Sequence, residues 1–413
     1  MLNSTTFHAL TSKPSPTPPF SSPLLVTPNT VASRSRTQPR IEVRYPQWVQ
    51  TLPWQFSFAT EQQKRALAHT VLKLCRQHQP HVEGAAAVFE ADSGRLLSVG
   101  PDLRAEHLSG HGEAPLVAIQ MAEARRQSFS LSSPGAPRCE LFVLGAPSMM
   151  SLGAVLWSGI RRLVIRPDSE TTRASRSQPL VEAQTWAYLR QTGIEVVSLP
   201  SGIRLEKLAA SSSGFSSLSL QRAGTAPALV TPRIEVDCAA WASDNIDWSR
   251  NYQDDTEKMM LALQLASRNV AEGTGGPFGT AIFHRATGRL ISVGMDRVFP
   301  LNNSTLHGET AAVQTAQRIL SNQDLKETGL ELFTSCAPCA MCMGAVLGSG
   351  IERMVSGATS DDARRIQFDE GPVFPSTWAA LSGLGISTER EVCHQEANAA
   401  FRQHVKTQPF FRS

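Results

Sequence analysis

The sequence predicts an α/β protein built from two tandem three-layer α/β/α domains. The chain has 413 residues, of which 41% are hydrophobic, and this is enough to fill more than one core. Long stretches of its first half recur, in the same order, in its second half. In each copy, apolar patterns typical of strands alternate with patterns typical of helices, as in a sheet layered between helices.

The recurrence is strong enough to indicate a tandem duplication. One segment returns letter for letter over five residues, and the longest shares 12 of 22 residues with its counterpart. The matching segments are 39–43 with 232–236, 86–100 with 280–294, 143–164 with 334–355, and 185–194 with 377–386. Self-similarity at a fixed shift identifies repeated structural units.

The duplication divides the chain into four parts. Residues 1–38 form a Ser/Thr/Pro-rich tail that we expect to be disordered. Residues 39–200 form the first domain, 201–231 a flexible linker and 232–413 the second domain. We expect a cytoplasmic protein. The acid-poor, Arg-containing tail also fits an organellar transit peptide, which leaves that location open.

Composition excludes several classes of protein. No apolar run approaches the roughly 18 residues that cross a bilayer, so we expect no membrane partner. The net charge of +3 becomes −1 without residues 1–41, which hold four basic side chains and no acidic one. Such a body lacks the basic excess of phosphate-binding proteins, so nucleic acid is not the favoured partner. Seven cysteines without a signal-peptide pattern favour a reducing compartment.

The second copy shows the expected elements most clearly. Apolar spacing and chain breakers predict helices at 254–271, 307–320 and 338–347 and strands at 279–283, 289–293, 330–333 and 352–356. The first two strands form a hairpin around Thr287-Gly288. The predicted order is therefore α-β-β-α-β-α-β.

Two short motifs in this copy carry the chemistry. His307-Gly308-Glu309 is followed, 32 residues after the histidine, by Cys339-Ala340-Met341-Cys342. One imidazole and two thiolates make a three-ligand zinc site with a fourth position open to water, which is the catalytic pattern. Glu309, two residues from the histidine, can move the proton of that water. Together, H-x-E and P-C-x-x-C form the signature of zinc-dependent deaminases.

At these residues the second copy resembles the cytidine-deaminase superfamily, and within it most of all the bacterial guanine deaminases. The resembling segments are 275–279, 334–342, 362–363 and 368–369. The resemblance implies two cytidine-deaminase-like domains and hydrolytic deamination of a small nucleobase or nucleoside, with a guanine-type purine first. It also implies zinc held by His307, Cys339 and Cys342, with Glu309 as proton shuttle.

The resemblance implies substrate contacts as well. Phe278 belongs to the Gly-Gly-Pro-Phe-Gly segment before the first strand, and Asp369 is the carboxylate that would help to bind a purine. Many relatives have an asparagine about eleven residues before the zinc histidine, where this chain has Asp296. A carboxylate accepts hydrogen bonds, so a ring that presents an N–H suits Asp296 best.

The first copy lacks the soft zinc ligands. His111-Gly112-Glu113 repeats the histidine motif, but Gly145, Ser148 and Ser151 stand where the second copy has cysteines. Serine hydroxyls bind zinc poorly at neutral pH, so we expect a zinc-free, inactive domain. By resemblance to dimeric relatives, the two copies form an intramolecular pseudo-dimer, with the first copy in the place of a partner subunit. We expect Trp157 in its core and a solvated helix near the carboxyl end, although that end can also close over the pocket.

Three alternatives remain open at this point. A cytosine-type ring is possible, because the residues around His307 are closer to fungal cytosine deaminase than to guanine deaminases. Adenosine in tRNA is a second alternative. The third is a non-catalytic scaffold, in which Cys336 closes a structural zinc site as the fourth ligand and Glu309 has no role.

Overall fold

The computed structural model describes residues 40–52, 54, 56–79, 82, 84–166, 181, 183–198, 221–222, 233–368 and 371–407. The predicted tail at 1–38 and most of the predicted linker at 201–231 lie outside these residues. Within them the chain forms two five-stranded sheets with the same strand order. This arrangement confirms the predicted fold class of two tandem α/β/α domains.

The first half contributes most of the smaller elements. Its strands are β1 (Ile41–Arg44), β2 (Phe56–Ser57), β3 (Ala85–Glu90), β4 (Leu96–Pro101), β5 (Cys139–Leu144), β6 (Arg162–Arg166), β7 (Glu195–Ser198) and β8 (Gln221–Arg222). Its helices are α2 (Glu61–His78), α3 (Arg104–His107), α4 (Ala114–Arg126), α5 (Met149–Ser158) and α6 (Ala183–Gln191), with 3-10 turns η1 (Gln47–Thr51) and η2 (Gly110–Gly112).

The second half repeats the order of the main elements and ends in a helix. Its strands are β9 (Arg233–Val236), β10 (Gly279–His284), β11 (Arg289–Met295), β12 (Leu330–Cys336), β13 (Arg353–Ala358) and β14 (Ser387–Glu389). Its helices are α8 (Ala240–Asn245), α9 (Asp255–Ala271), α10 (Val298–Leu301), α11 (Gly308–Leu320), α12 (Ala340–Ser349), α13 (Ser360–Arg365), α14 (Pro375–Gly383) and α15 (His394–Thr407). No helix in the described ranges is long and apolar enough to cross a bilayer.

Both sheets are mixed in the same way. The orders are β4-β3-β5-β6-β7 and β11-β10-β12-β13-β14. In each, the first hairpin is antiparallel, the third strand pairs antiparallel with the first, and the last two strands are added in parallel. The central strands are buried along their whole length, because helices cover both faces.

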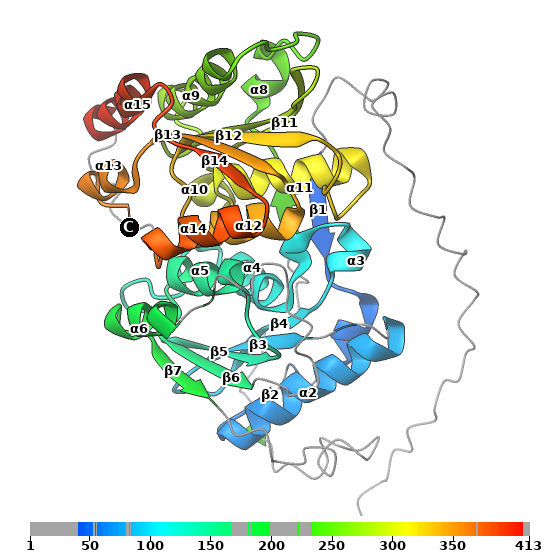
Figure 1. Cartoon of the computed structure of the whole chain (residues 1–413). Helices are drawn as coiled ribbons and strands as arrows, with labels where there is room; N and C mark the ends of the chain where they lie inside the picture. Colours follow the sequence, from blue (N-terminus) through cyan, green and yellow to red (C-terminus); the bar gives the residue numbers. More distant parts are fainter. Residues whose placement is uncertain are drawn as a thin grey trace, which may run out of the picture.

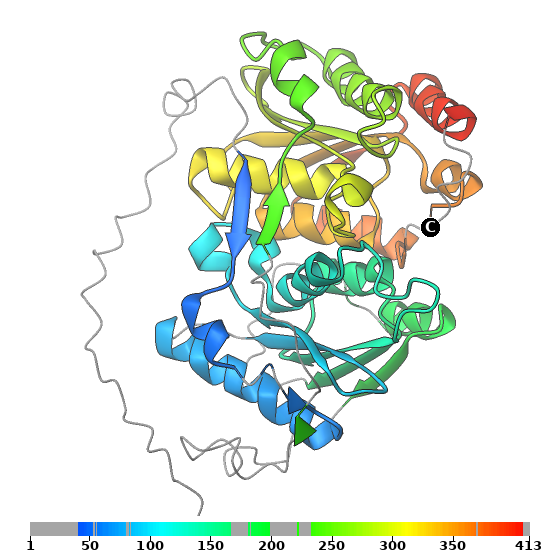
Figure 2. The ribbon, with the colours of Figure 1, turned by 180° about the vertical axis from the view of Figure 1, so that it is seen from behind.

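The two halves face each other through the helices on their inner sheet faces (Figure 1). Helix α5 packs against α12, and Met341 and Cys342 of the second half share a core cluster with Met150 and Leu152 of the first. On another side, β1 pairs antiparallel with β9, so the two copies of the repeated Ile-Glu-Val segment lie beside each other (Figure 2).

Each half carries the same buried ion-pair network. Lys258 and Arg353 both bind Glu331, near the start of the central strand β12, at 2.6 and 2.7 Å. In the first half, Lys64 and Arg162 bind Glu140 in the same way. These charges are satisfied by one another, which makes their burial tolerable and fixes α2 and α9 on their sheets.

The predicted elements of the second copy are all present, with ends that agree or differ by at most three residues. Helix α12 begins at Ala340 rather than at Pro338, because Cys339 is its extended N-cap. Trp157, expected in the core, is only partly buried and contacts the second half. The carboxyl-terminal helix, expected to be solvated, buries Ala397, Phe401 and His404 against the second domain.

Candidate active site

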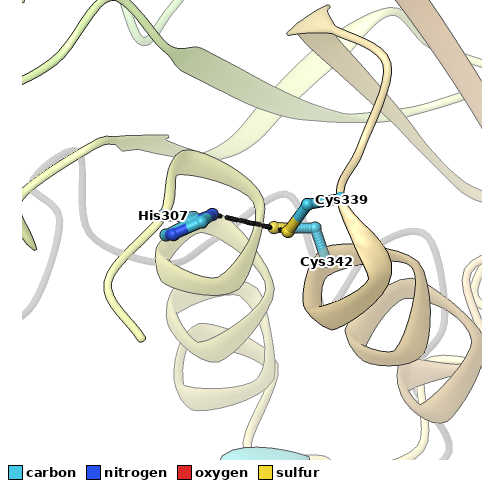
Figure 3. Close-up of side chains that lie close together, drawn as sticks. All are labelled: His307, Cys339 and Cys342. Carbon is cyan, nitrogen blue, oxygen red and sulfur yellow. Dashed lines mark hydrogen bonds between the residues drawn. The ribbon is translucent and has the colours of Figure 1, made fainter. Parts of the chain in front are cut away.

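The three predicted zinc ligands meet where helices α11 and α12 begin. His307 is the N-cap of α11, Cys339 is the N-cap of α12, and Cys342 lies in the first turn of α12. Their ligand atoms all lie within 4.8 Å of one another, and they form the one such cluster found among the described residues (Figure 3). Strand β12 ends at Cys336, three residues before Cys339, and so leads directly to the start of α12.

The distances between these atoms fit zinc. The Nδ1 atom of His307 lies 3.6 Å from the Sγ atoms of both Cys339 and Cys342. Tetrahedral zinc, with Zn–N of about 2.0 Å and Zn–S of about 2.3 Å, separates nitrogen from sulfur by about 3.5 Å. The donor set of one imidazole and two thiols is also the set that zinc prefers.

The surroundings of Cys339 favour its ionised form, which binds metal. Burial opposes ionisation of Cys339, but the hydrogen bond from Cys342 and the charge of His307 hold the pKa of the Cys339 thiol well below its usual value. The positive end of the α12 dipole acts in the same direction.

Cys336 does not join the cluster. Its Sγ atom donates to the backbone oxygen of Thr359 at 3.6 Å, and Cys336 lines the cavity without joining the group of ligand atoms. A closed site with three cysteines and one histidine is therefore not formed, and the fourth position around the three ligands faces a cavity.

Glu309 lies beside this cluster on the first turn of α11. Its Oε1 atom accepts a hydrogen bond from Thr334 Oγ1 at 2.8 Å, and Cys342 Sγ lies 3.2 Å from its Oε2 atom. Glu309 is almost fully buried, and burial raises the pKa of its carboxyl group. A carboxyl group with a raised pKa is suited to accept and donate a proton in general acid–base catalysis.

The cluster and Glu309 form one end of a cavity of about 340 Å³. This volume is within the range of small-molecule sites. Its walls combine planar side chains with a few polar groups from both halves. Lining residues of the second half include Gly276, Phe278, Asp296, Phe299, Ser304, Phe368 and His404, and those of the first half include Phe129, Ser130, Ser132, Trp157, Arg161 and Thr192.

Two of the three predicted substrate contacts line this cavity. Phe278 packs edge-on against Phe368 and Phe401, with ring centroids 4.9 and 5.6 Å apart. Asp296 Oδ1 accepts the backbone N–H groups of Gly276 and Val298, both at 3.3 Å. The third predicted contact, Asp369, lies outside the described residues.

The sequence predicts that the first half takes the place of a partner subunit, but not which of its residues reach the cavity. The Trp157 ring lies edge-on to the His307 ring, with ring centroids 4.8 Å apart. The ring centroids of Phe129 and Phe299 are 4.5 Å apart. These residues are far from His307 in the chain, and no local pattern reveals that the two halves meet here. His404 could have been found, because Ala397, Ala400, Phe401 and His404 follow the spacing of a buried helix face.

Comparison with known proteins identifies the family. Residues 252–358 match the model of the cytidine and deoxycytidylate deaminase zinc-binding region. The guanine deaminase of Bacillus subtilis is 34% identical over 113 residues, which are 27% of this chain and 70% of that protein. The chain belongs to the cytidine-deaminase superfamily.

Other members of the superfamily are similar to a comparable degree. The tRNA-specific adenosine deaminase of Buchnera aphidicola is 34% identical over 28% of this chain and 72% of its own length. The cytosine deaminase of Candida albicans is 32% identical over 25% of this chain and 66% of its own length. The solved guanine deaminase of Nitrosomonas europaea is 34% identical, with a TM-score of 0.39 over 41% of this chain and 94% of its own. The chain is therefore a hydrolytic deaminase of nucleobases or nucleosides, and its cofactor is zinc.

The first half departs further from the superfamily pattern than the sequence indicates. Leu103 N donates to Gly112 O, as Arg297 N donates to Leu306 O in the second half. Helices α4 and α11 begin two residues after these acceptors. His307 therefore corresponds to Glu113, and the alignment of His111 with His307 is wrong by two residues.

The corrected equivalence replaces every group of the zinc site. Glu113 takes the place of His307, Ser148 and Ser151 take the places of the two cysteines, and Pro115 takes the place of Glu309. Ser148 Oγ donates to Glu113 Oε2 at 2.7 Å, and Ser151 N donates to Ser148 Oγ at 3.1 Å. A hydrogen-bonded cluster thus fills the position of the metal site.

Proposed function

We propose that the second half deaminates a free purine base or its nucleoside, with guanine first, and that the first half is a zinc-free domain that completes the pocket. The observation that carries this proposal is the position of Glu309 beside three zinc-binding groups, at one end of a 340 Å³ cavity with aromatic walls. Planar walls favour a planar heterocycle.

The roles of the residues follow from their positions. His307, Cys339 and Cys342 would hold zinc, which supplies a water molecule that ionises near neutral pH. Glu309 accepts a proton from the attacking water and passes it to the ring nitrogen beside the reacting carbon. Glu309 then takes the second proton from the new hydroxyl group on the ring carbon and passes it to the amine, so that the C–N bond breaks, ammonia leaves and the ring carbon becomes a carbonyl. Thr334 keeps the carboxylate turned toward this path through its hydrogen bond to Oε1.

Asp296 supports a ring that presents N–H groups. Its carboxyl group is 7% exposed, lines the cavity and accepts only backbone N–H donors in the described structure. Guanine presents N–H groups along one edge, whereas cytosine presents a carbonyl oxygen and an unprotonated nitrogen beside its amine. Burial raises the pKa of the Asp296 carboxyl group, and the charge of His307 and the two backbone N–H donors oppose this shift. In its ionised form, Asp296 favours guanine over cytosine at this position.

The experiment is ammonia release by the zinc-loaded protein with guanine, guanosine, adenine, adenosine, cytosine and cytidine. We expect release from guanine or guanosine, and a loss of roughly 10²- to 10⁴-fold in kcat in Glu309→Gln with zinc still bound. If none of the six compounds releases ammonia and a tRNA anticodon stem is deaminated, the tRNA alternative replaces this proposal. Unchanged ammonia release in Glu309→Gln would remove the assigned role of that residue.

A further inference from the structure

The loop that leads into His307 is buried beneath the first half. Asn303, Ser304 and Thr305 are 4%, 1% and 0% exposed, although they belong to a short irregular segment between α10 and α11. Ser304 lines the cavity, and His307 follows two residues after Thr305. The conformation of this loop therefore determines where the cavity wall and the imidazole lie.

Two side chains of α4 hold this loop across the boundary between the halves. Gln120 Nε2 donates to Thr305 Oγ1 at 2.5 Å, and Thr305 Oγ1 in turn donates to Asn303 Oδ1 at 2.8 Å. One turn further along the helix, Glu123 Oε2 accepts the backbone N–H of Ser304 at 3.0 Å.

Glu123 is an unusual residue at this position. It is fully buried, and its Oε1 atom has no hydrogen-bond partner in the described part of the chain. Burial raises the pKa of its carboxyl group well above the usual value, with no cation nearby to oppose the shift. A buried acid without a counter-charge destabilises a fold unless it is neutral, so its presence requires a reason beyond packing.

The contact runs in one direction only within the described residues. The equivalents of Gln120 and Glu123 in the second half are Gln314 and Gln317. Gln314 donates to Thr310 O of its own helix, and Gln317 donates to Gln323 O of its own half. The first half therefore holds the loop before His307, whereas the equivalent side chains of the second half bind only within their own half.

We propose that Gln120 and Glu123 of the zinc-free half are positioning residues for the active site of the other half. They fix residues 303–306, and through them the cavity wall at Ser304 and the setting of His307. The inference rests on the proposed function for its kinetic consequence, and it gives the first half a part in catalysis beyond covering the pocket.

The kinetic test compares Glu123→Ala with Glu123→Gln. The amide of glutamine keeps an oxygen for Ser304 N, so Glu123→Gln should keep KM within about twofold of the wild type. Alanine removes the acceptor from a buried N–H, and we expect kcat/KM to fall about tenfold or more, mainly through KM, with one zinc ion still bound per chain. Gln120→Met, which keeps the side-chain volume but not the donor, should change KM in the same direction.

The matched control is Glu90→Gln, another buried carboxyl group of the first half. Glu90 binds Ser93, Arg95 and, at the end of α4, Arg126, and none of these hydrogen bonds involves residues 303–306. The Glu90→Gln variant should have a lower free energy of unfolding than the wild type and an unchanged KM. If Glu90→Gln raises KM as much as Glu123→Ala does, or if Glu123→Ala leaves KM unchanged, the positioning role is overturned.

A second measurement does not depend on activity. Hydrogen–deuterium exchange of a peptide that contains residues 303–306 reports on the Ser304 N–H directly. We expect exchange at least about tenfold faster in Glu123→Ala and unchanged in Glu123→Gln. Equal exchange in both variants overturns the inference. If the wild-type protein deaminates none of the compounds, the proposed function is refuted. The exchange measurement then decides the positioning role of Glu123 on its own.

Discussion

His111 is buried in the first half without a hydrogen-bond partner, in the described residues, for either nitrogen of its ring. It faces a small space that is lined by Ile41 and Val43 and also by polar side chains, Gln120 and Gln314 among them. Because it corresponds to Thr305 and not to the zinc histidine, it is not a displaced ligand. A buried imidazole without a hydrogen-bond partner costs stability.

Replacement of His111 by leucine should stabilise the protein and remove a sensitivity to acid. Burial lowers the pKa of His111 to about 3, whereas an unfolded histidine titrates near 6.5. The unfolded state therefore binds the proton first, and stability is lost as pH falls from about 6.5 toward 3. We expect a gain of about 1–3 kcal/mol in unfolding free energy at pH 7. Between pH 7 and pH 5, the wild type should lose about 2 kcal/mol more than His111→Leu.

Urea unfolding at the two pH values measures both effects. The control is His78→Leu, at an exposed position of α2, which should keep the acid sensitivity of the wild type. Equal pH dependence in the wild type and in His111→Leu would contradict the account of His111 as a buried, neutral side chain.

At the scale of elements, α15 decides how the pocket is closed on the side of the second half. Phe401 packs on Phe278, and the ring centroids of His404 and Phe368 are 5.8 Å apart. The helix is attached at its start by Asp362 of α13. Asp362 Oδ2 accepts hydrogen bonds from His394 Nε2 at 2.7 Å and from Thr359 Oγ1 at 2.6 Å.

The Asp362→Asn substitution should loosen this attachment in a pH-dependent way. Burial opposes ionisation of Asp362, but the hydrogen bonds from Thr359 and His394 hold the pKa of its carboxyl group well below the usual value. A lowered folded-state pKa stabilises the protein above the unfolded pKa of about 3.9, and this contribution is lost as pH falls below it. We expect Tm to fall by about 3–10 °C at pH 7, with the difference from the wild type shrinking below about pH 4.

The neighbouring Asp361 provides the control for this measurement. It is 75% exposed and pairs with Arg364 on the same helix. Exposed pairs contribute about 0–1 kcal/mol, so Asp361→Asn should change Tm by no more than a few degrees at any pH. A pH-independent loss of Tm in Asp362→Asn would show that packing, and not the charge, holds α15.

At the scale of the whole molecule, the sequence predicts the two domains because the duplication left long identities in the strands and in α5 and α12. It also predicts the zinc cluster, because metal geometry fixes the spacing of His307, Cys339 and Cys342. It does not predict the correct register around His111, since a repeated His-Gly-Glu string misleads the alignment where the helix start sets the equivalence. The cavity walls contributed by Trp157 and Phe129 depend on docking of the halves, which no local pattern encodes.

That docking depends on two glycines where α5 crosses α12. A Cβ atom on Gly153 would lie 2.4 Å from the backbone nitrogen of Met341, and one on Gly344 would lie 2.3 Å from that of Met150. Backbone atoms cannot move aside as a flexible side chain can, so an added methyl group must separate the helices. Trp157 follows Gly153 by one helical turn, and its position against His307 changes with the crossing.

We therefore expect Gly153→Ala to lower both Tm and kcat/KM, although alanine favours a helix over glycine by about 1 kcal/mol. Gly348→Ala is the matched control on α12, because a Cβ atom there meets nothing within 4 Å. That variant should gain up to about 1 kcal/mol of stability and keep its activity. Thermal unfolding and steady-state kinetics of the two variants separate close helix packing from helix propensity. If Gly153→Ala is as stable and as active as Gly348→Ala, the active site does not depend on the close approach of the two halves.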